Sequence, residues 1–199
     1  SGIVSYPELL LMELPEDTQH GQPFIEATGL EDTMVEVDLT PNRPDCASVI
    51  GIAREVAGIY KKQLNVPYKG VKLEVPSSSF SVEIESPELC PRYAGRLIKN
   101  VKIGPSPWWL RKRLLSIGQR PINNIVDVTN LVMMEYGQPL HAFDFDTLRG
   151  QKIIVRTPKE SELKFTTLDN VSRTLAPDTL MICDGEGPVA VAGVMGGLD

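Results

Sequence analysis

Apolar and polar residues alternate along residues 33–39 with a period of two, as expected for a half-buried strand. The segment 40–44, with two prolines, ends this pattern. Apolar residues then recur at helical spacing over residues 46–60, and Asp45 is placed to cap the first helical turn. The pattern predicts a strand followed by a helix.

Residues 70–103 are expected to form short strands on both sides of a domain boundary. Short strands are expected at residues 70–76 and 80–84, and the sequence Ser-Pro-Glu at 86–88 is the expected domain boundary. Beyond it, residues 92–103 have the apolar content of a strand.

Two further helices have clear start and stop signals. Ser106 is expected to cap a helix that Pro107 opens and Gly118 ends, with Leu110, Leu114 and Ile117 on its buried stripe. A third helix is predicted over residues 125–136, capped by Asn123 or Asn124 and stopped by Gly137. Its predicted buried stripe is Ile125, Val128, Val132 and Tyr136.

From residue 151 onward the pattern is strand and turn only. Strands are expected at 152–156, 163–168 and 180–183, and after the turn at 184–188 another at 189–194. Helices and strands segregate instead of alternating, which predicts an α+β fold with mixed or antiparallel sheets and a few packed helices.

Composition narrows the class of protein. The chain has 199 residues, 42% of them hydrophobic, and holds no run of eighteen apolar residues and no signal-peptide pattern at its start. We expect a soluble, cytoplasmic protein without a membrane segment. The three cysteines are far apart, so neither a disulfide framework nor a zinc site is expected, and we expect buried thiols. The chain starts without Met, and no cap or polar tail marks its end, so we expect a fragment.

A net charge of −6 argues against a general nucleic-acid-binding protein. The charge is uneven, however, because residues 89–126 contain no acid. They hold the cations Arg92, Arg96, Lys99, Lys102, Arg111, Lys112, Arg113 and Arg120. Such a surface suits transient contact with an RNA backbone, although a solvated charged face is the more common explanation.

His141 follows the third predicted helix in a loop that could line a pocket. An imidazole titrates near neutral pH and could transfer a proton or bond an ester. A structural hydrogen bond is the alternative. With Asp144 and Asp146 it could also bind a metal, but no further His or Cys lies nearby and Asp144 could cap the following turn, so no metal site is predicted.

Two other segments are chemically suggestive. The third helix carries Asp127, Thr129 and Asn130 among apolar residues, so one edge could face a ligand or bond neighbouring backbone. The glycine-rich segment 191–197 lacks the Lys-Ser/Thr of a phosphate-binding loop. A tight bend in a sheet explains its small residues as well as a ligand does.

Five segments together carry a family resemblance. They are residues 35–46 (VEVDLTPNRPDC), 51–57 (GIAREVA), 120–130 (RPINNIVDVTN), 137–144 (GQPLHAFD) and 192–197 (AGVMGG). In this order and spacing they resemble the β subunit of bacterial phenylalanyl-tRNA synthetases. The resemblance implies three parts: the end of an OB-fold module (1–30), the second half of a small split α/β module with a linker (31–85), and an incomplete editing domain (86–199).

The resemblance also implies a function and a site. Editing domains of this family hydrolyse tyrosyl-tRNA made in error on the phenylalanine tRNA. We therefore expect His141, Asn130 and Thr129 as catalytic residues, with His141 positioning the ester or a water molecule. Asn124, Phe143, Gly193 and Gly196 are expected to bind substrate, and Arg92, Arg111, Lys112 and Arg113 to contact tRNA.

The family pattern places the glutamate that recognises the tyrosine hydroxyl after residue 199. The full synthetase is expected to be an α2β2 assembly that binds the phenylalanine tRNA and uses ATP and Mg²⁺, and this chain alone is expected to hold no cofactor and not to aminoacylate. Two alternatives remain. One is a tRNA-binding module in which the His141 loop is inert, and the other is a scaffold marked by an apolar patch around residues 35–56.

Overall fold

The computed structural model of this chain describes residues 14, 17–66, 70 and 80–198. The chain forms two compact units, which are described separately below. Unit 1 comprises Ser1–Lys69 with Lys102–Ala142, and unit 2 comprises Gly70–Val101 with Phe143–Asp199. The first is helical and the second is built on a mixed sheet, so the predicted α+β class is confirmed. No helix in the described ranges is long and apolar enough to cross a membrane.

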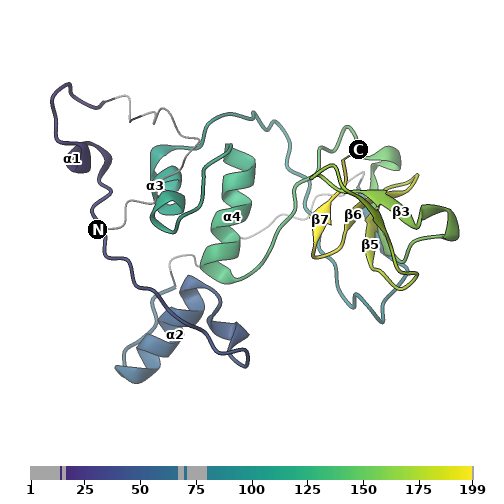
Figure 1. The fold of residues 1–199 in the computed structure, drawn as a ribbon, viewed down its shortest axis with the longest axis horizontal. Helices are drawn as coiled ribbons and strands as arrows, with labels where there is room; N and C mark the ends of the chain where they lie inside the picture. Colours follow the sequence, from purple (N-terminus) through teal and green to yellow (C-terminus); the bar gives the residue numbers. More distant parts are fainter. Residues whose placement is uncertain (1–13, 15–16, 67–69, 71–79, 199) are drawn as a thin grey trace. The chain divides into compact units, whose positions relative to one another are not determined.

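Unit 1 contains the helices α1 (Phe24–Thr28), α2 (Val49–Ile59), α3 (Trp108–Ser116) and α4 (Asn124–Tyr136), with the 3-10 turn η1 (Pro44–Cys46) before α2. Helices α3 and α4 lie side by side, and α2 contacts α4 (Figure 1). Leu110 and Leu114 of α3 pack against Leu131 of α4, and all three side chains are buried. This small leucine cluster is the core that joins α3 to α4.

Helix α4 begins and ends where the capping pattern predicts. The Asn123 side chain accepts hydrogen bonds from the backbone amides of Ile125 and Val126, and Gly137 ends the helix in the left-handed conformation at φ 74°. The predicted buried stripe is wrong. Asp127 and Leu131 are buried, whereas Ile125 and Val132 are half-buried and Val128 and Tyr136 are exposed. Asp127 can be buried because hydrogen bonds from Ser106 and Ile122 offset its desolvation.

Helix α2 begins later than predicted. The side chain of Ser48, not that of Asp45, caps it by accepting from the Gly51 amide. Asp45 lies instead in η1, which packs directly on α2. A Cβ atom at Gly51 would lie 2.0 Å from the Asp45 carbonyl oxygen, so this contact requires glycine.

Helix α3 has the predicted position but not the predicted cap. Pro107 is the N-cap residue, and the Ser106 hydroxyl donates to Asp127 of α4 instead of capping its own helix. Ile117, expected on the buried stripe, is exposed because the helix ends at Ser116 and only Leu110 and Leu114 face α4.

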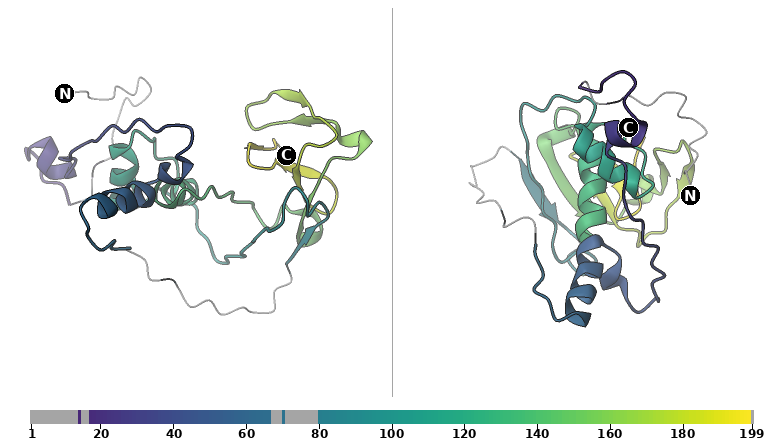
Figure 2. Two further views of the ribbon diagram at one scale, coloured as in Figure 1. Left: turned by 90° about the horizontal axis from the view of Figure 1, so that it is seen from below. Right: turned by 90° about the vertical axis from the view of Figure 1, so that its left-hand side faces the viewer.

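Unit 2 is organised around a five-stranded mixed sheet with the order β1-β2-β5-β6-β7. Figure 1 labels β5, β6 and β7 of this sheet, and Figure 2 shows the ribbon from two further sides. Strands β1 (Ser81–Ile84) and β2 (Lys152–Arg156) are parallel. The remaining pairs are antiparallel, through β5 (Met181–Cys183), β6 (Pro188–Val191) and β7 (Met195–Gly196). A second, two-stranded sheet pairs β3 (Lys164–Thr166) with β4 (Ser172–Thr174), and the 3-10 turns η2 (Arg149–Gln151) and η3 (Glu160–Glu162) flank β2.

Both faces of strand β2 are covered. Ile153 and Val155 belong to one buried cluster with Ile182 of β5, whereas Ile154 belongs to a second cluster with Met181 and Cys183. A strand buried on both faces reads as a continuous apolar run, which is why residues 152–156 were predictable from the sequence. The strands predicted at 80–84, 163–168 and 180–183 are also present, within shorter bounds.

Two predicted strands are wrong, because residues 33–39 and 92–103 form no strand. Met34 and Val35 are 74% and 75% exposed, and Ile98 is also exposed. A strand needs a partner for its backbone hydrogen bonds and a cover for its apolar face, and neither segment has a paired strand among the residues described. Apart from Gly70, the segment predicted as a strand at 70–76 lies outside the described residues.

The predicted three-part division stays a prediction. Most of residues 1–16, the start of the expected OB-fold remnant, lies outside the described residues. The expected boundary at 86–88 falls within unit 2, where Ser86 is buried and accepts backbone hydrogen bonds from Leu89 and Cys90.

Candidate functional site

Helix α4 carries three of the predicted site residues. Asn124 stands in its first turn, and Thr129 and Asn130 stand in the middle, all three half-buried. Because residues 124 and 130 are less than two helical turns apart, the helix holds the three side chains at fixed positions relative to one another. A rigid helix is a suitable element from which to present reactive groups.

The Asn124 side chain is engaged with the neighbouring backbone. Its amide nitrogen donates to the Lys102 carbonyl at 2.9 Å, and its oxygen accepts from the Gly104 amide at 3.3 Å. Thr129 is also engaged, because its hydroxyl donates to the Val126 carbonyl at 2.7 Å within the helix. These two side chains therefore stabilise the local structure of unit 1.

Asn130 differs from its neighbours. Within the described part of the chain, no hydrogen bond involves its side-chain amide. An amide offers two donors and an acceptor, so Asn130 retains its full capacity to bond a polar ligand. Of the α4 residues predicted for the site, it is the one available for binding.

Asp127 is a buried carboxylate that the sequence indicated only as a polar residue in an apolar helix. It is 0% exposed and accepts from the Ser106 hydroxyl at 2.5 Å and from the Ile122 amide at 2.7 Å. The carboxylate therefore joins the first turn of α4 to the segments that precede both α3 and α4. The side chain of Asp127 therefore stabilises the local structure and does not face a ligand.

His141 lies in the loop that follows α4. The side chain is exposed, yet surrounding atoms desolvate it in part and lower its pKa below the ordinary value of 6.5. The neutral imidazole is therefore favoured at neutral pH, and one of its nitrogens can accept a proton. In the same loop, the Asp144 carboxylate accepts a hydrogen bond from the Asp146 amide at 3.1 Å. Asp144 therefore caps a turn, which was the alternative to a role as a metal ligand.

The remaining predicted substrate-binding residues belong to unit 2. Phe143 packs against the buried cluster of the sheet. Gly193 occupies the tight turn between β6 and β7 at φ 69°, with open space where a side chain would start, and Gly196 is buried in β7 opposite Ala190. The glycine-rich segment is thus a hairpin, the sheet bend that its small residues allowed.

The predicted tRNA contacts are divided between the units. Arg111, Lys112 and Arg113 lie on α3, and Arg92 is an exposed residue of unit 2. Arg113 pairs with Glu135 of α4 at 2.7 Å. Arg111 and Arg113 also lie over the rings of Trp108 and Trp109, at 5.4 Å and 5.6 Å from the ring centroids.

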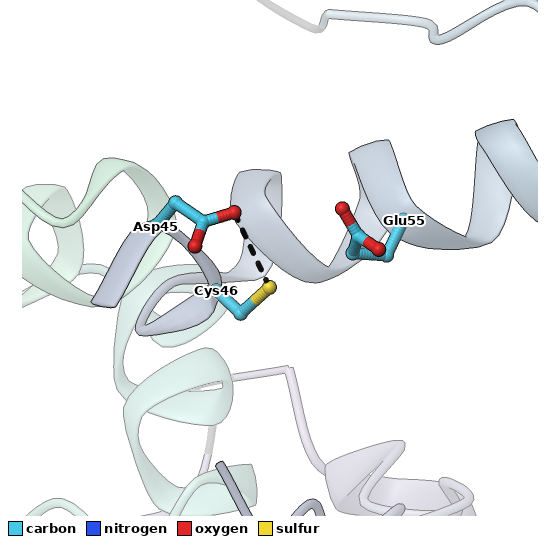
Figure 3. Close-up of side chains that lie close together, drawn as sticks. All are labelled: Asp45, Cys46 and Glu55. Atoms are coloured by element: carbon cyan, nitrogen blue, oxygen red, sulfur yellow. Dashed lines mark hydrogen bonds between the residues drawn. The ribbon is translucent and has the colours of Figure 1, made fainter. Parts of the chain in front are cut away.

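One side-chain cluster was not expected from the sequence. Asp45, Cys46 and Glu55 place potential ligand atoms within 4.8 Å of one another, and Figure 3 shows the Cys46 thiol directed at Asp45. Arg43 accompanies them, with its Nη2 atom 2.8 Å from Asp45 and 2.6 Å from Glu55. The guanidinium lowers the pKa of Asp45 to about 2 and supplies the positive charge that the carboxylates require. This cluster is an arginine-centred ion pair at the start of α2.

The thiols agree largely with expectation. Cys46 and Cys183 are buried, Cys90 is half-buried, and all three are free. Burial raises the pKa of Cys183 to about 11, although the nearby Arg156 guanidinium opposes this shift. A thiol of this kind remains protonated and unreactive at neutral pH.

Comparison with known proteins identifies relatives over most of the chain. Residues 89–199 match the B3/4 domain family. The chain is 63% identical over 187 residues to the phenylalanine–tRNA ligase beta subunit of Desulfotalea psychrophila, covering 94% of this chain and 23% of that subunit. It is 53% identical over 187 residues to the corresponding subunit of Carboxydothermus hydrogenoformans, with the same two coverages, and 50% identical over 185 residues to that of Geobacillus kaustophilus, covering 92% and 23%. The chain therefore spans less than a quarter of the length of these relatives.

Proposed function

We propose a function for this chain, which belongs to the B3/4 domain family: it is part of the β subunit of a phenylalanine–tRNA ligase and hydrolyses the ester of tyrosyl-tRNA formed in error. The proposal of a hydrolytic role rests mainly on His141 and its loop. An imidazole of lowered pKa follows directly on the helix that presents the unengaged Asn130 amide. A base and a neutral hydrogen-bonding group are the parts that ester hydrolysis by water requires.

The chemistry uses water as the nucleophile. Neutral His141 accepts a proton from the water molecule as its oxygen attacks the ester carbonyl carbon. The tetrahedral intermediate then expels the ribose oxygen, which takes up the proton that His141 had accepted, so that free tyrosine and uncharged tRNA are released and His141 is neutral again. The Asn130 amide is suited to bond the carbonyl oxygen or the amino acid as negative charge develops.

Editing of this kind is needed because a hydrophobic pocket discriminates poorly between phenylalanine and tyrosine. Tyrosine is phenylalanine with an added hydroxyl, and an apolar pocket rejects such an addition only about 100-fold. A second site that bonds the hydroxyl discriminates more strongly, because phenylalanine would leave its buried polar partner unpaired. We place that partner, a glutamate by family resemblance, beyond residue 199.

The proposed assembly extends beyond this chain. In the complete ligase we expect an α subunit as partner in an α2β2 assembly, the phenylalanine tRNA as substrate, and ATP with Mg²⁺ for the aminoacylation reaction. The chain itself is proposed to act in the cytoplasm, without a cofactor or metal.

The experiment compares hydrolysis of preformed tyrosyl-tRNA and phenylalanyl-tRNA by this chain and by a version extended downstream. We expect the extended protein to cleave tyrosyl-tRNA selectively and the present chain to lack that selectivity. A folded extended protein that cleaved neither ester would leave RNA binding or scaffolding as the function.

A non-catalytic RNA-binding role is the second candidate, and the three consecutive cations of α3 favour it. Charge reversal of Lys112 and Arg113 would then abolish tRNA binding, whereas His141→Ala would change neither binding nor hydrolysis. Combined measurement of both properties separates this role from editing.

A further inference from the structure

Helix α3 combines aromatic and cationic side chains in an arrangement that the hydrolytic site does not use. Its sequence, WWLRKRLLS, contains two tryptophans, three consecutive cations and no acid. Leu110 and Leu114 face the core, which leaves Trp109 and Arg113, one turn apart, on the exposed side of the helix. Trp109 is 52% exposed, which is unusual for so large an apolar side chain.

The two tryptophans are held by contacts with their surroundings. The Trp108 indole nitrogen donates to the Thr28 carbonyl at 3.0 Å, and the Arg111 guanidinium lies over the Trp108 ring. Glu135 of α4 pairs with Arg113 at 2.7 Å, and the Arg113 guanidinium lies over the Trp109 ring. These contacts order the side chains before any ligand binds, which lowers the entropy lost on binding.

We propose that the exposed face of α3 is a stacking platform for unpaired bases of RNA. Indole rings and guanidinium planes are the surfaces on which splayed bases stack, and Lys112 with its neighbouring arginines supplies charge for the phosphates between them. Single-stranded RNA is favoured over a duplex because paired bases are already stacked on each other and cannot reach an indole face.

Charge favours RNA over a protein as the occupant. Tryptophan and arginine are enriched at protein–protein interfaces and do not separate the two, but lysine is depleted there, and Lys112 stands between two arginines of α3. Phosphates complement the charge of Arg111 and Lys112, and α3 itself contains no acid, whereas Arg113 is paired with Glu135 of α4. The inference rests on the second candidate function, RNA binding by α3, and deepens it by naming unpaired bases as what the helix binds. It does not depend on ester hydrolysis and would stand if the chain cleaved no ester.

The tryptophan content makes a direct test possible. Both tryptophans of the 199-residue chain are in α3, so tryptophan fluorescence reports on this helix alone. The probe is a single-stranded oligocytidylate of roughly six nucleotides. Controls are an abasic oligomer of equal length, which keeps the phosphates but lacks bases, and a blunt RNA duplex. Trp108→Phe and Trp109→Phe each leave one reporter.

We expect the single strand to quench the fluorescence of the Trp108→Phe variant, and the abasic oligomer and duplex to quench it far less. Trp109→Ala should weaken binding of the single strand about tenfold, measured by anisotropy of a labelled strand. Equal affinity for the abasic oligomer would overturn the proposal and reduce the surface to a site of charge attraction. Unchanged affinity in both Trp109→Ala and Trp109→Phe would overturn it as well, and leave a protein surface as the occupant.

Discussion

At the scale of the residue, hydrogen bonding separates side chains that the sequence alone placed together. Asn124, Asp127 and Thr129 bond nearby backbone or Ser106, and so contribute to the local structure of unit 1. Asn130, on the same helix, keeps its amide available. The sequence indicated which residues of this helix are polar, but a pattern of residue types cannot show which donors are already satisfied.

This distinction predicts opposite effects for two asparagines. Asn130→Ala should slow hydrolysis of tyrosyl-tRNA at least tenfold with little change in the free energy of unfolding. Asn124→Ala should instead destabilise the chain by about 1–2 kcal/mol, because the Gly104 amide and Lys102 carbonyl lose their partners. Chemical denaturation and single-turnover hydrolysis measure the two quantities. Equal destabilisation by both substitutions would contradict this assignment.

The lowered pKa of His141 predicts a specific pH dependence. Hydrolysis requires neutral imidazole, so the rate should be constant at neutral pH and fall as pH decreases through a midpoint below 6.5. NMR titration of the imidazole should give the same midpoint. A midpoint above 6.5, or an acid limb that persisted in His141→Ala, would show that another group controls the reaction.

At the scale of the element, the ends of α4 were predictable, whereas the caps of α2 and α3 and the buried face of α4 were not. Asn123 and Gly137 act through bonds to residues close in sequence, so the ends of α4 followed from local pattern. Its buried face did not, because Asp127 is stabilised by Ser106, which lies 21 positions earlier. The predictions of strands at 33–39 and 92–103 were wrong for a related reason. A strand forms only where a second strand pairs with it, and the alternation of apolar and polar residues within one segment does not show whether such a partner exists.

The buried contacts of Asp127 predict a graded loss of stability. Asp127→Ala should lower the unfolding free energy by about 1–3 kcal/mol, because the Ile122 amide would lose its acceptor. Asp127→Asn should cost less, since its amide oxygen can still accept from Ile122. Urea unfolding followed by tryptophan fluorescence of α3 measures both variants. An alanine variant as stable as the asparagine variant would contradict a structural role for this oxygen.

At the scale of the whole molecule, the residues implied by family resemblance come from both units. Asn130 and His141 belong to unit 1, whereas Phe143 and Gly193 belong to unit 2. Order and spacing of the motifs identified these residues, but hydrophobic periodicity alone could not have associated them. Several large apolar side chains among the described residues are also exposed, including Met34, Val35 and Ile59.

This surface predicts hydrophobic dye binding by the folded chain. Met34→Ser with Val35→Thr should reduce the fluorescence of a bound anilinonaphthalene dye, because both side chains are largely exposed. The free energy of unfolding should change by less than about 0.5 kcal/mol. Strong destabilisation would instead indicate that the two side chains are buried in solution.

The central claim is that His141 serves ester hydrolysis, and single-turnover release of tyrosine from tyrosyl-tRNA tests it most directly. The downstream-extended protein would be compared with its His141→Ala variant and with His20→Ala, which removes the other histidine of residues 1–199. We predict a loss of about 100-fold for His141→Ala and an unchanged rate for His20→Ala. A well-folded His141→Ala variant that released tyrosine at the original rate would contradict the account.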